Sequence, residues 1–252
     1  MTHQRDESHY SYAVYADPAM ARTFEDKRFG GPIGDLVAST QARVLADMIG
    51  RIQDGSIIDV GTGAGRAAIV LAHGGARVTA VDASAQMLEV ARSRAAQDGV
   101  SIDFRLGDVH ALEFEDRAFD VAVCLRVLMH APDWPKAMGE LCRVADRLVI
   151  FDYPSATSTA ALQSLTRRAI QALGGRTEAY RVFTDGAIRR ELARSGFSVR
   201  SVHRQFVLPI QFHKLIGSRR FTVATETLME RAGLLRHFGS PVTVCAERCA
   251  SS

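Results

Sequence analysis

The sequence has few of the features that mark membrane, secreted or metal-bound proteins. No apolar run approaches the roughly 18 residues of a membrane-spanning helix, and residues 1–8 are polar, without an apolar stretch behind them. Of the four cysteines, Cys124 and Cys245 sit in apolar runs, where a thiol packs as a small hydrophobic group. Cys245 and Cys249 lack the second Cys or His pair of a zinc site. We therefore expect no membrane span, targeting peptide, disulfide framework or metal, and a cytoplasmic location.

Charge of one sign is also scarce. The chain has 31 basic and 28 acidic residues, a formal net charge of +3, and the basic ones are scattered. Basic pairs on helices usually form a solvated face, so we expect no nucleic-acid partner. The alternative is that a pair binds an anionic substrate. The pairs are Arg167-Arg168, Arg189-Arg190 and Arg219-Arg220.

The apolar pattern alternates between strands and helices from residue 56 onward. Residues 56–60 form a short apolar run. The next five residues, 61–65, include three glycines, and residues 67–73 then have the pattern of a helix. Ser84 is in place to cap a further helix after a second strand at 77–81. Further strands are predicted at 102–106, 119–125 and 147–151, and helices at 134–144, 159–173 and 185–195.

Strands that alternate with helices form parallel sheets covered on both faces. We therefore predict an α/β, Rossmann-like fold with a seven-stranded, mostly parallel sheet, whose late strands are 198–208 and 242–246. At 252 residues the chain fits one domain. In our division of this single domain, 1–40 form an N-terminal helical arm, 41–210 and 240–250 the core, and 211–239 an insertion between the last two strands that can cover a pocket.

The glycine-rich turn after Asp59 predicts a nucleotide-like ligand. Glycines at a helix N-terminus let a ligand approach the backbone closely. Asp82 follows the first glycine by about 21 residues, where a carboxylate can hold two ribose hydroxyls. An NAD(P)-dependent oxidoreductase fits these features equally well. Arg66 argues against the oxidoreductase, because a dinucleotide fingerprint has Gly or Ala at that position. Asp108 offers a hydrogen-bond acceptor to an adenine amino group, and a nicotinamide enzyme has no particular need of it.

Four segments together resemble the class I S-adenosylmethionine (SAM) methyltransferases, in the branch of the ubiquinone and menaquinone biosynthetic and natural-product enzymes. The resemblance covers residues 56–153. This sequence departs from the family at residues 143–146, which lack the proline-glycine turn common before the fifth strand. The segments are Asp59-Val60-Gly61-Thr62-Gly63-Ala64-Gly65, Val81-Asp82-Ala83-Ser84, Gly107-Asp108-Val109 and Phe119-Asp120-Val121 followed by Leu128-Met129-His130.

This resemblance implies SAM as the cofactor and a role for each matching residue. The turn around Thr62 lines the methionine portion, Asp82 holds the ribose, and Asp108 recognises the adenine edge. Arg28 could pair with the cofactor carboxylate or simply face solvent. The full implied set is Asp59, Gly61, Thr62, Gly63, Asp82, Ala83, Met87, Gly107, Asp108, Val109, Leu125, Arg126 and Arg28.

Methyl transfer to a small-molecule acceptor requires alignment and exclusion of water more than any particular catalytic group. A base is needed only for an acceptor that is protonated at working pH, and the candidates are His130, His213 and Asp152. We expect His213 to be exposed on a loop and Asp152 to follow the fifth strand. Oxygen is slightly favoured as the acceptor atom, and a homodimer is possible. A non-catalytic SAM-binding module and an enzyme for prenylated quinone precursors are further alternatives.

Overall fold

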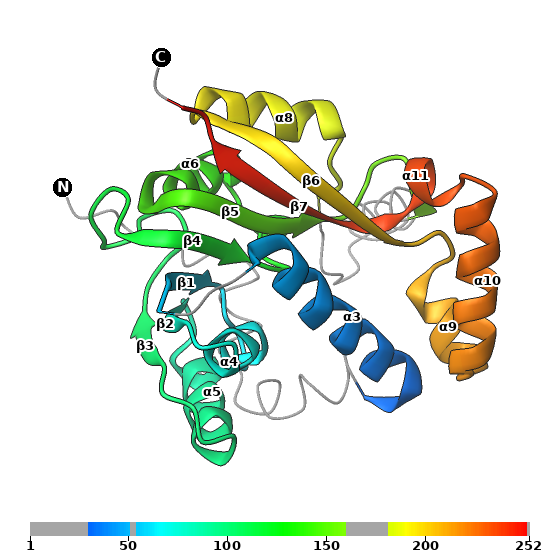
Figure 1. The fold of residues 1–252 in the computed structure, drawn as a ribbon, viewed down its shortest axis with the longest axis horizontal. Helices are drawn as coiled ribbons and strands as arrows, with labels where there is room; N and C mark the ends of the chain where they lie inside the picture. Colours follow the sequence, from blue (N-terminus) through cyan, green and yellow to red (C-terminus); the bar gives the residue numbers. More distant parts are fainter. Residues whose placement is uncertain (1–29, 51–53, 160–180, 251–252) are drawn as a thin grey trace, which may run out of the picture.

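The structure is a computed structural model that describes residues 30–50, 54–159 and 181–250. The strands of its sheet are β1 Ser56–Val60, β2 Arg77–Asp82, β3 Asp103–Leu106, β4 Phe119–Cys124, β5 Ala145–Tyr153, β6 Phe197–Phe206 and β7 Ser240–Arg248. The strand order is β3-β2-β1-β4-β5-β7-β6 (Figure 1). Pairs among β1 to β5 are parallel, and β7 pairs antiparallel with β5 and β6. The prediction of a Rossmann-like, seven-stranded, mostly parallel sheet is confirmed.

Helices cover both faces of this sheet, as predicted. In Figure 1, α6 and α8 lie above the sheet, and α3 and α4 lie below it. The described helices are α3 Gly31–Ile49, α4 Arg66–His73, α5 Ala85–Gln97, α6 Trp134–Val144, α8 Asp185–Arg194, α9 Ile210–Ile216, α10 Arg219–Arg231 and α11 Leu235–Phe238. The predicted helix at 159–173 falls almost entirely outside the described residues.

Alternation along the central strands supplies a core to each face, because successive side chains in a strand point to opposite sides. Ile57 of β1 packs in the core with α3 and α4, whereas Ile58 packs in the core with α6 and α8. In β4, Val121 and Ala122 divide in the same way. The central strands therefore consist of apolar residues on both sides, which is the pattern of a buried parallel sheet.

Helix ends follow signals that the sequence carries. The hydroxyl of Ser84 accepts a hydrogen bond from the backbone N–H of Met87 at 3.2 Å, which confirms Ser84 as the N-cap of α5. Asp133 caps α6 in the same way through Lys136, and Pro135 occupies the first turn, where no N–H is needed. These caps hold both helices at bounds close to the predicted ones.

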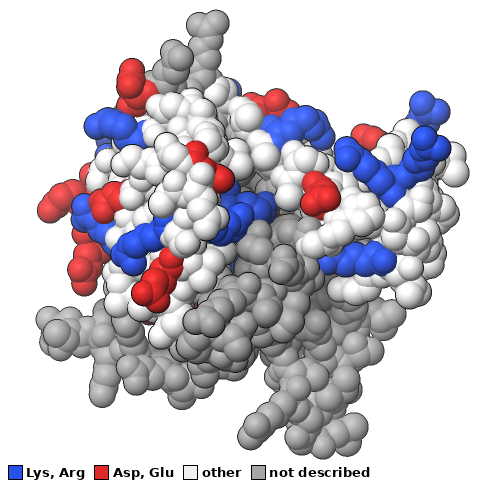
Figure 2. All heavy atoms as spheres, turned by 90° about the horizontal axis from the view of Figure 1, so that it is seen from below, with Lys and Arg blue, Asp and Glu red and all other residues white. Residues whose placement is uncertain are grey.

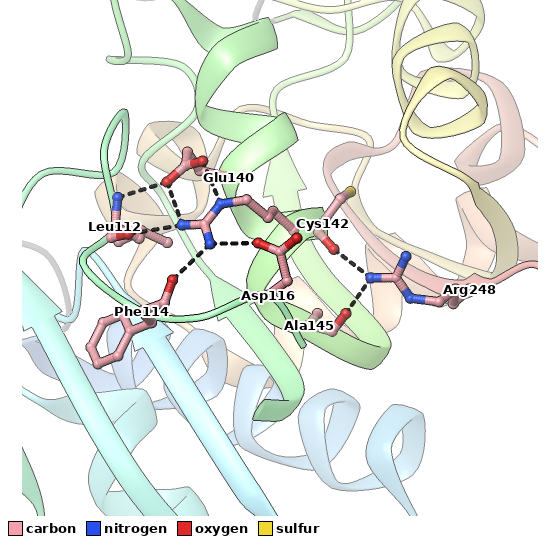
Figure 3. Close-up of polar contacts among 8 residues, drawn as sticks. Leu112, Phe114, Asp116, Glu140, Cys142, Ala145 and Arg248 are labelled. Atoms are coloured by element: carbon pink, nitrogen blue, oxygen red, sulfur yellow. Dashed lines mark hydrogen bonds and ion pairs between the residues drawn. The ribbon is translucent and has the colours of Figure 1, made fainter. Parts of the chain in front are cut away.

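The missing proline-glycine turn leaves no connecting residue between α6 and β5, since the helix ends at Val144 and the strand begins at Ala145. Arg248 at the end of β7 reaches this junction. Its guanidinium donates to the carbonyl oxygens of Cys142 at 2.8 Å and Ala145 at 2.5 Å (Figure 3). Carbonyl groups at the end of a helix have no partner within the helix, and Arg248 satisfies them here.

Two segments flank the sheet outside the alternating pattern. Helix α3 packs against the sheet through Val44, Leu45 and Met48, and the expected boundary between arm and core, at residues 40 and 41, falls inside this helix. Residues 210–239 form the three helices α9, α10 and α11, which project at the right of Figure 1. We call this segment the lobe.

Candidate cofactor cleft

The turn between β1 and α4 is held against the end of β2 by its own backbone. The N–H groups of Gly61 and Thr62 donate to the carbonyl oxygen of Val81 at 2.7 and 3.0 Å. A Cβ atom at Gly61 would lie 2.1 Å from a methyl group of Val127. Gly61 and Gly63 also have positive φ angles of 72° and 57°, which side chains disfavour. Only glycine fits at position 61, and the left-handed backbone favours glycine at position 63.

Asp59 is the next-to-last residue of β1, just before this turn, and it is almost fully buried. Its carboxylate accepts a hydrogen bond from the hydroxyl of Thr62 at 2.7 Å. Burial raises the pKa of Asp59 from 3.8 to about 6, although the Thr62 hydrogen bond and the charge of Arg66 both act to lower it. Asp59 therefore braces the turn from below, and its ionisation is costly.

Asp82 links the glycine turn to the beginning of α5. One carboxylate oxygen accepts from the N–H of Gly63 at 2.8 Å, and the other accepts from the N–H of Ser84 at 2.9 Å. Burial raises the pKa of Asp82, against these hydrogen bonds. The carboxylate is thus fixed in orientation, and each oxygen has a second lone pair that can accept from a ligand hydroxyl.

Asp108 follows β3, and His110 orients it. The backbone N–H of His110 donates to Oδ1 of Asp108 at 2.9 Å, and Nδ1 of its ring lies 2.7 Å from the same oxygen. A carboxylate only accepts, so Nδ1 is the donor. Sequence reasoning missed His110, although its position two residues after Asp108 is a local signal for such a bond.

The segment after Asp108 is tied to α6 by Arg143 and Glu140. The guanidinium of Arg143 contacts Leu112, Phe114, Asp116 and Glu140, the four residues labelled at the left of Figure 3. It donates to the carbonyl oxygens of Leu112 and Phe114 at 2.8 and 2.7 Å. It also pairs with both carboxylate oxygens of Glu140 at 2.8 and 2.9 Å. This network fixes the path of the chain that leaves Asp108.

Asp152 holds the end of β4 rather than facing the cleft. It lies within β5 instead of after it, is buried, and accepts a hydrogen bond from the N–H of Arg126 at 2.5 Å. Arg126 has a φ of 65°, a left-handed conformation that costs of order 1 kcal/mol for a residue other than glycine. Asp152 does not line the described cavity. Its carboxylate stabilises the strained turn at Arg126.

These parts converge on one cavity at the carboxyl ends of β1, β2, β3 and β4. Asp59, Asp82 and Asp108 all line it. Of the predicted cofactor residues, Arg28 lies outside the described residues, and all the others line this cavity. The lining residues that sequence reasoning did not name for this role are Ala64, Arg66, Ala67, Ser84, His110, Val127, Ala131 and Pro132, with Val60 from β1.

The two histidines considered as bases lie in different places. His130 is part-buried and lines the cavity. The expectation that His213 is exposed on a loop is wrong: it lies in α9 and is fully buried. Its Nε2 atom is 2.8 Å from a carboxylate oxygen of Glu226, and its Nδ1 atom is 3.1 Å from the hydroxyl of Thr222. His213 therefore joins α9 to α10 and does not line the described cavity.

The cavity fits an adenosyl group on three observations. Gly61 and Gly63 line the cavity without side chains, so a ligand can approach the backbone of the turn closely. Asp82 presents oriented acceptor oxygens of the kind that two adjacent ribose hydroxyls require. Asp108 presents an oriented acceptor for an exocyclic amino group. Apart from these groups the wall is largely apolar, with Val109 and Leu125 among its residues.

In the described ranges, none of the helices is both long and apolar enough to cross a bilayer.

Comparison with known proteins agrees with this geometry. A family model described as "Methyltransferase domain" matches residues 58–148, a range that contains all of the residues that line the cavity. A demethylmenaquinone methyltransferase of Thermus thermophilus is 32% identical over 164 residues, 57% of this chain and 74% of the relative. A ubiquinone biosynthesis O-methyltransferase of Methylocella silvestris is 46% identical over 77 residues, 31% of this chain. This chain spans about a third of the length of such ubiquinone relatives, 30% and 37% in two of them.

A solved structure shares the fold over nearly the whole chain. The magnesium protoporphyrin IX methyltransferase of Synechocystis PCC 6803 with bound SAH has a TM-score of 0.67 and 20% sequence identity. The match covers 96% of this chain and all of that one. The likeness supports the topology of the sheet.

Proposed function

Since the chain belongs to the class I SAM-dependent methyltransferases, we propose that it binds SAM in the cleft and transfers the methyl group to a small molecule. The observation that carries the proposal is the convergence of the glycine turn, Asp82 and Asp108 on one cavity. An oxygen acceptor is slightly favoured. The names of the ubiquinone relatives, which are O-methyltransferases, support that preference.

Each side of the cleft has its own role in this proposal. The backbone of Gly61 and Gly63 contacts the methionine portion, and Asp82 accepts hydrogen bonds from the ribose hydroxyls. Asp108, oriented by His110, accepts from the adenine amino group, and Met87 packs beside the ring. Arg126 borders the sulfonium end, where Asp152 holds its backbone. Arg28 remains a candidate partner of the cofactor carboxylate.

The reaction needs little from the protein beyond geometry. SAM supplies a methyl group that is already activated as part of a sulfonium. The chain must align the acceptor and keep water out, and alignment alone can contribute roughly 7–11 kcal/mol. Among the base candidates, His130 lines the cavity, so we propose that it accepts the proton of a hydroxyl acceptor.

Two alternatives make different predictions. An NAD(P)-dependent oxidoreductase would bind a nicotinamide dinucleotide in preference to SAM, and a non-catalytic module would bind SAM without turnover. Isothermal titration calorimetry with SAM, its demethylated product S-adenosylhomocysteine (SAH) and NAD separates the first. We expect heat with SAM and SAH only, whereas binding of NAD alone would overturn the proposal.

Turnover separates the second alternative. We expect that radiolabelled methyl groups from SAM appear in at least one member of a panel of phenolic and other hydroxyl metabolites. His130→Ala should lower kcat for a phenolic acceptor by about 100-fold, the usual range for a general base, and leave SAH affinity unchanged. A buried histidine that serves only packing would instead change the stability without changing the pH profile of kcat. SAM binding with no product from any acceptor class would favour the module.

A further inference from the structure

The lobe exposes an unusual share of the apolar surface. Ten large hydrophobic side chains are exposed in the described part of the chain, and eight of them lie between residues 212 and 238. Leu215 is 86% exposed and Leu228 is 69% exposed. Single exposed hydrophobic residues are ordinary, but a cluster of them marks an interaction surface.

Five of these side chains form what we call the apolar patch: Phe212, Leu215, Ile216, Phe221 and Leu228. Phe212 and Ile216 are one turn apart on α9, and Phe221 and Leu228 are two turns apart on α10, so each pair shares a helix face. The rings of Phe212 and Phe221 lie 6.3 Å apart and join the two faces. The apolar patch therefore spans both helices.

The lobe also accounts for the whole net charge of the chain. Residues 210–239 contain five basic and two acidic side chains, and the chain has 31 and 28, which leaves 26 of each elsewhere. Arg219, Arg220 and Arg231 are exposed. In Figure 2, the projecting part at the right, which contains α9 to α11, has white surface beside blue groups and little red. Apolar and cationic groups thus share one projection.

Of the two acidic side chains, Glu226 is turned inward. Its carboxylate accepts from the backbone N–H groups of Val207 and Leu208 at 2.8 and 3.2 Å, and it lies 2.8 Å from Nε2 of His213. It therefore does not offset the surface cations. These contacts also clamp α9 and α10 to the end of β6, so that the apolar patch is held in a fixed shape.

We propose that the lobe docks the protein on the surface of a bilayer that contains anionic lipids. Amphipathic helices that carry Lys and Arg beside Leu and Phe bind at this interface, through apolar burial and attraction to anionic headgroups. A second copy of the chain fits less well, because a two-fold contact would place the same cationic face of each copy against the other. The proposal concerns this face of the protein and does not depend on the identity of the acceptor.

The place of the lobe gives this docking a direction. Strand β6 runs parallel to β5, since both pair antiparallel with β7. The lobe follows the carboxyl end of β6, and therefore projects from the same edge of the sheet as the cleft. A docked molecule turns that edge towards the lipid surface.

Vesicle sedimentation tests the proposal with matched variants. The full chain is mixed with phosphatidylcholine vesicles, with and without phosphatidylglycerol, and we expect binding to the anionic vesicles. Leu215→Glu should lower the partition about tenfold or more, since it removes an exposed leucine that docking would bury in the bilayer. The double variant Arg219→Glu, Arg220→Glu should lower it about 30-fold or more.

The chain supplies a control for each variant. Val202 is an exposed hydrophobic residue on β6, and Arg189 and Arg190 are an exposed basic pair on α8. Val202→Glu and the double variant Arg189→Glu, Arg190→Glu should bind vesicles as the unaltered chain does. Unchanged circular dichroism and SAH affinity show that all four variants are folded.

Three outcomes would overturn the proposal. The first is equal partition into both kinds of vesicle or into neither, and the second is equal losses in the lobe and control variants. The third is a concentration-dependent dimer in sedimentation velocity that Leu215→Glu dissociates, because the patch would then be the interface between two copies.

Discussion

The cleft and the lobe occupy the same edge of the sheet but are built in opposite ways. In the cleft, Asp82 and Asp108 are held by backbone N–H groups that lie within a few residues of a strand end. In the lobe, the side chains of His213 and Glu226 hold two helices together, and the apolar patch faces outward. In the cleft the backbone therefore holds the polar side chains in place, whereas in the lobe side chains hold the helices in place.

Because separate sets of contacts hold the two regions, we expect them to respond separately to substitution. Changes in the cleft should alter cofactor affinity and leave vesicle binding unchanged. Changes in the clamp of the lobe should alter stability and vesicle binding and leave cofactor affinity unchanged. Four substitutions test this separation.

Asp82→Ala should have the largest effect. It removes a charged acceptor that we assign to two ribose hydroxyls, each hydrogen bond being worth about 1.5–3 kcal/mol, so SAH affinity should fall several hundred-fold by calorimetry. Asp98 is exposed at the end of α5, and Asp98→Ala is the matched control. Retained affinity in Asp82→Ala would place the ribose elsewhere.

His213→Ala should destabilise the lobe. Removing the fully buried ring leaves a cavity and takes one hydrogen-bond partner each from Glu226 and Thr222, which costs about 3 kcal/mol, and urea unfolding measures the loss. The same variant should bind SAH within about twofold of the unaltered chain. A parallel loss of SAH affinity would contradict the independence of the two regions.

The ionisation of Asp59 should appear as a pH dependence of stability. Its pKa is about 6 in the folded chain and 3.8 without burial, so the folded chain holds this proton more tightly. Stability from the protonated form is present below pH 3.8 and is lost as the pH rises through about 6, by about 3 kcal/mol in total.

Asp59→Asn has no such titration and separates this effect from that of the other groups. Its free energy of unfolding relative to the unaltered chain should rise by about 1–2 kcal/mol between about pH 5 and about pH 7. A difference between the two chains that does not vary with pH would mean that Asp59 keeps an ordinary pKa.

His110→Phe should have the smallest effect of the four. The ring would still fill its place in the wall, but Asp108 would lose one of two hydrogen bonds to Oδ1, so SAH affinity should fall about tenfold. His237→Phe on α11 is the control. In the Asp108→Asn background, His110→Phe should cost less, since a purely structural role would give additive losses.

The convergence of the cleft residues on one cavity could be predicted from the sequence, because the geometry of the cleft is local. Gly61 is required by its φ angle and by its close contact with Val127, and the φ angle of Gly63 favours glycine. The ends of parallel strands meet at one edge whatever the details of packing. The sheet, the N-cap at Ser84 and helix α6 follow from patterns of the same short range. His110 also has a local signal, which is its position two residues after Asp108.

The errors concern side chains whose partners are distant in the sequence. Asp152 bonds to Arg126 across two strands, and His213 is buried by Glu226 and Thr222 of the next helix. No spacing rule reveals either contact. The apolar patch was equally hidden, because an apolar period predicts that a helix has a distinct face and does not say whether that face lies inside or outside.

A crystal structure with SAH bound tests the central claim most directly. We expect the ribose hydroxyls of SAH to lie within hydrogen-bonding distance of Asp82 and the adenine amino group to lie beside Asp108. SAH bound away from these two carboxylates, or the two carboxylates facing different ligands, would contradict it.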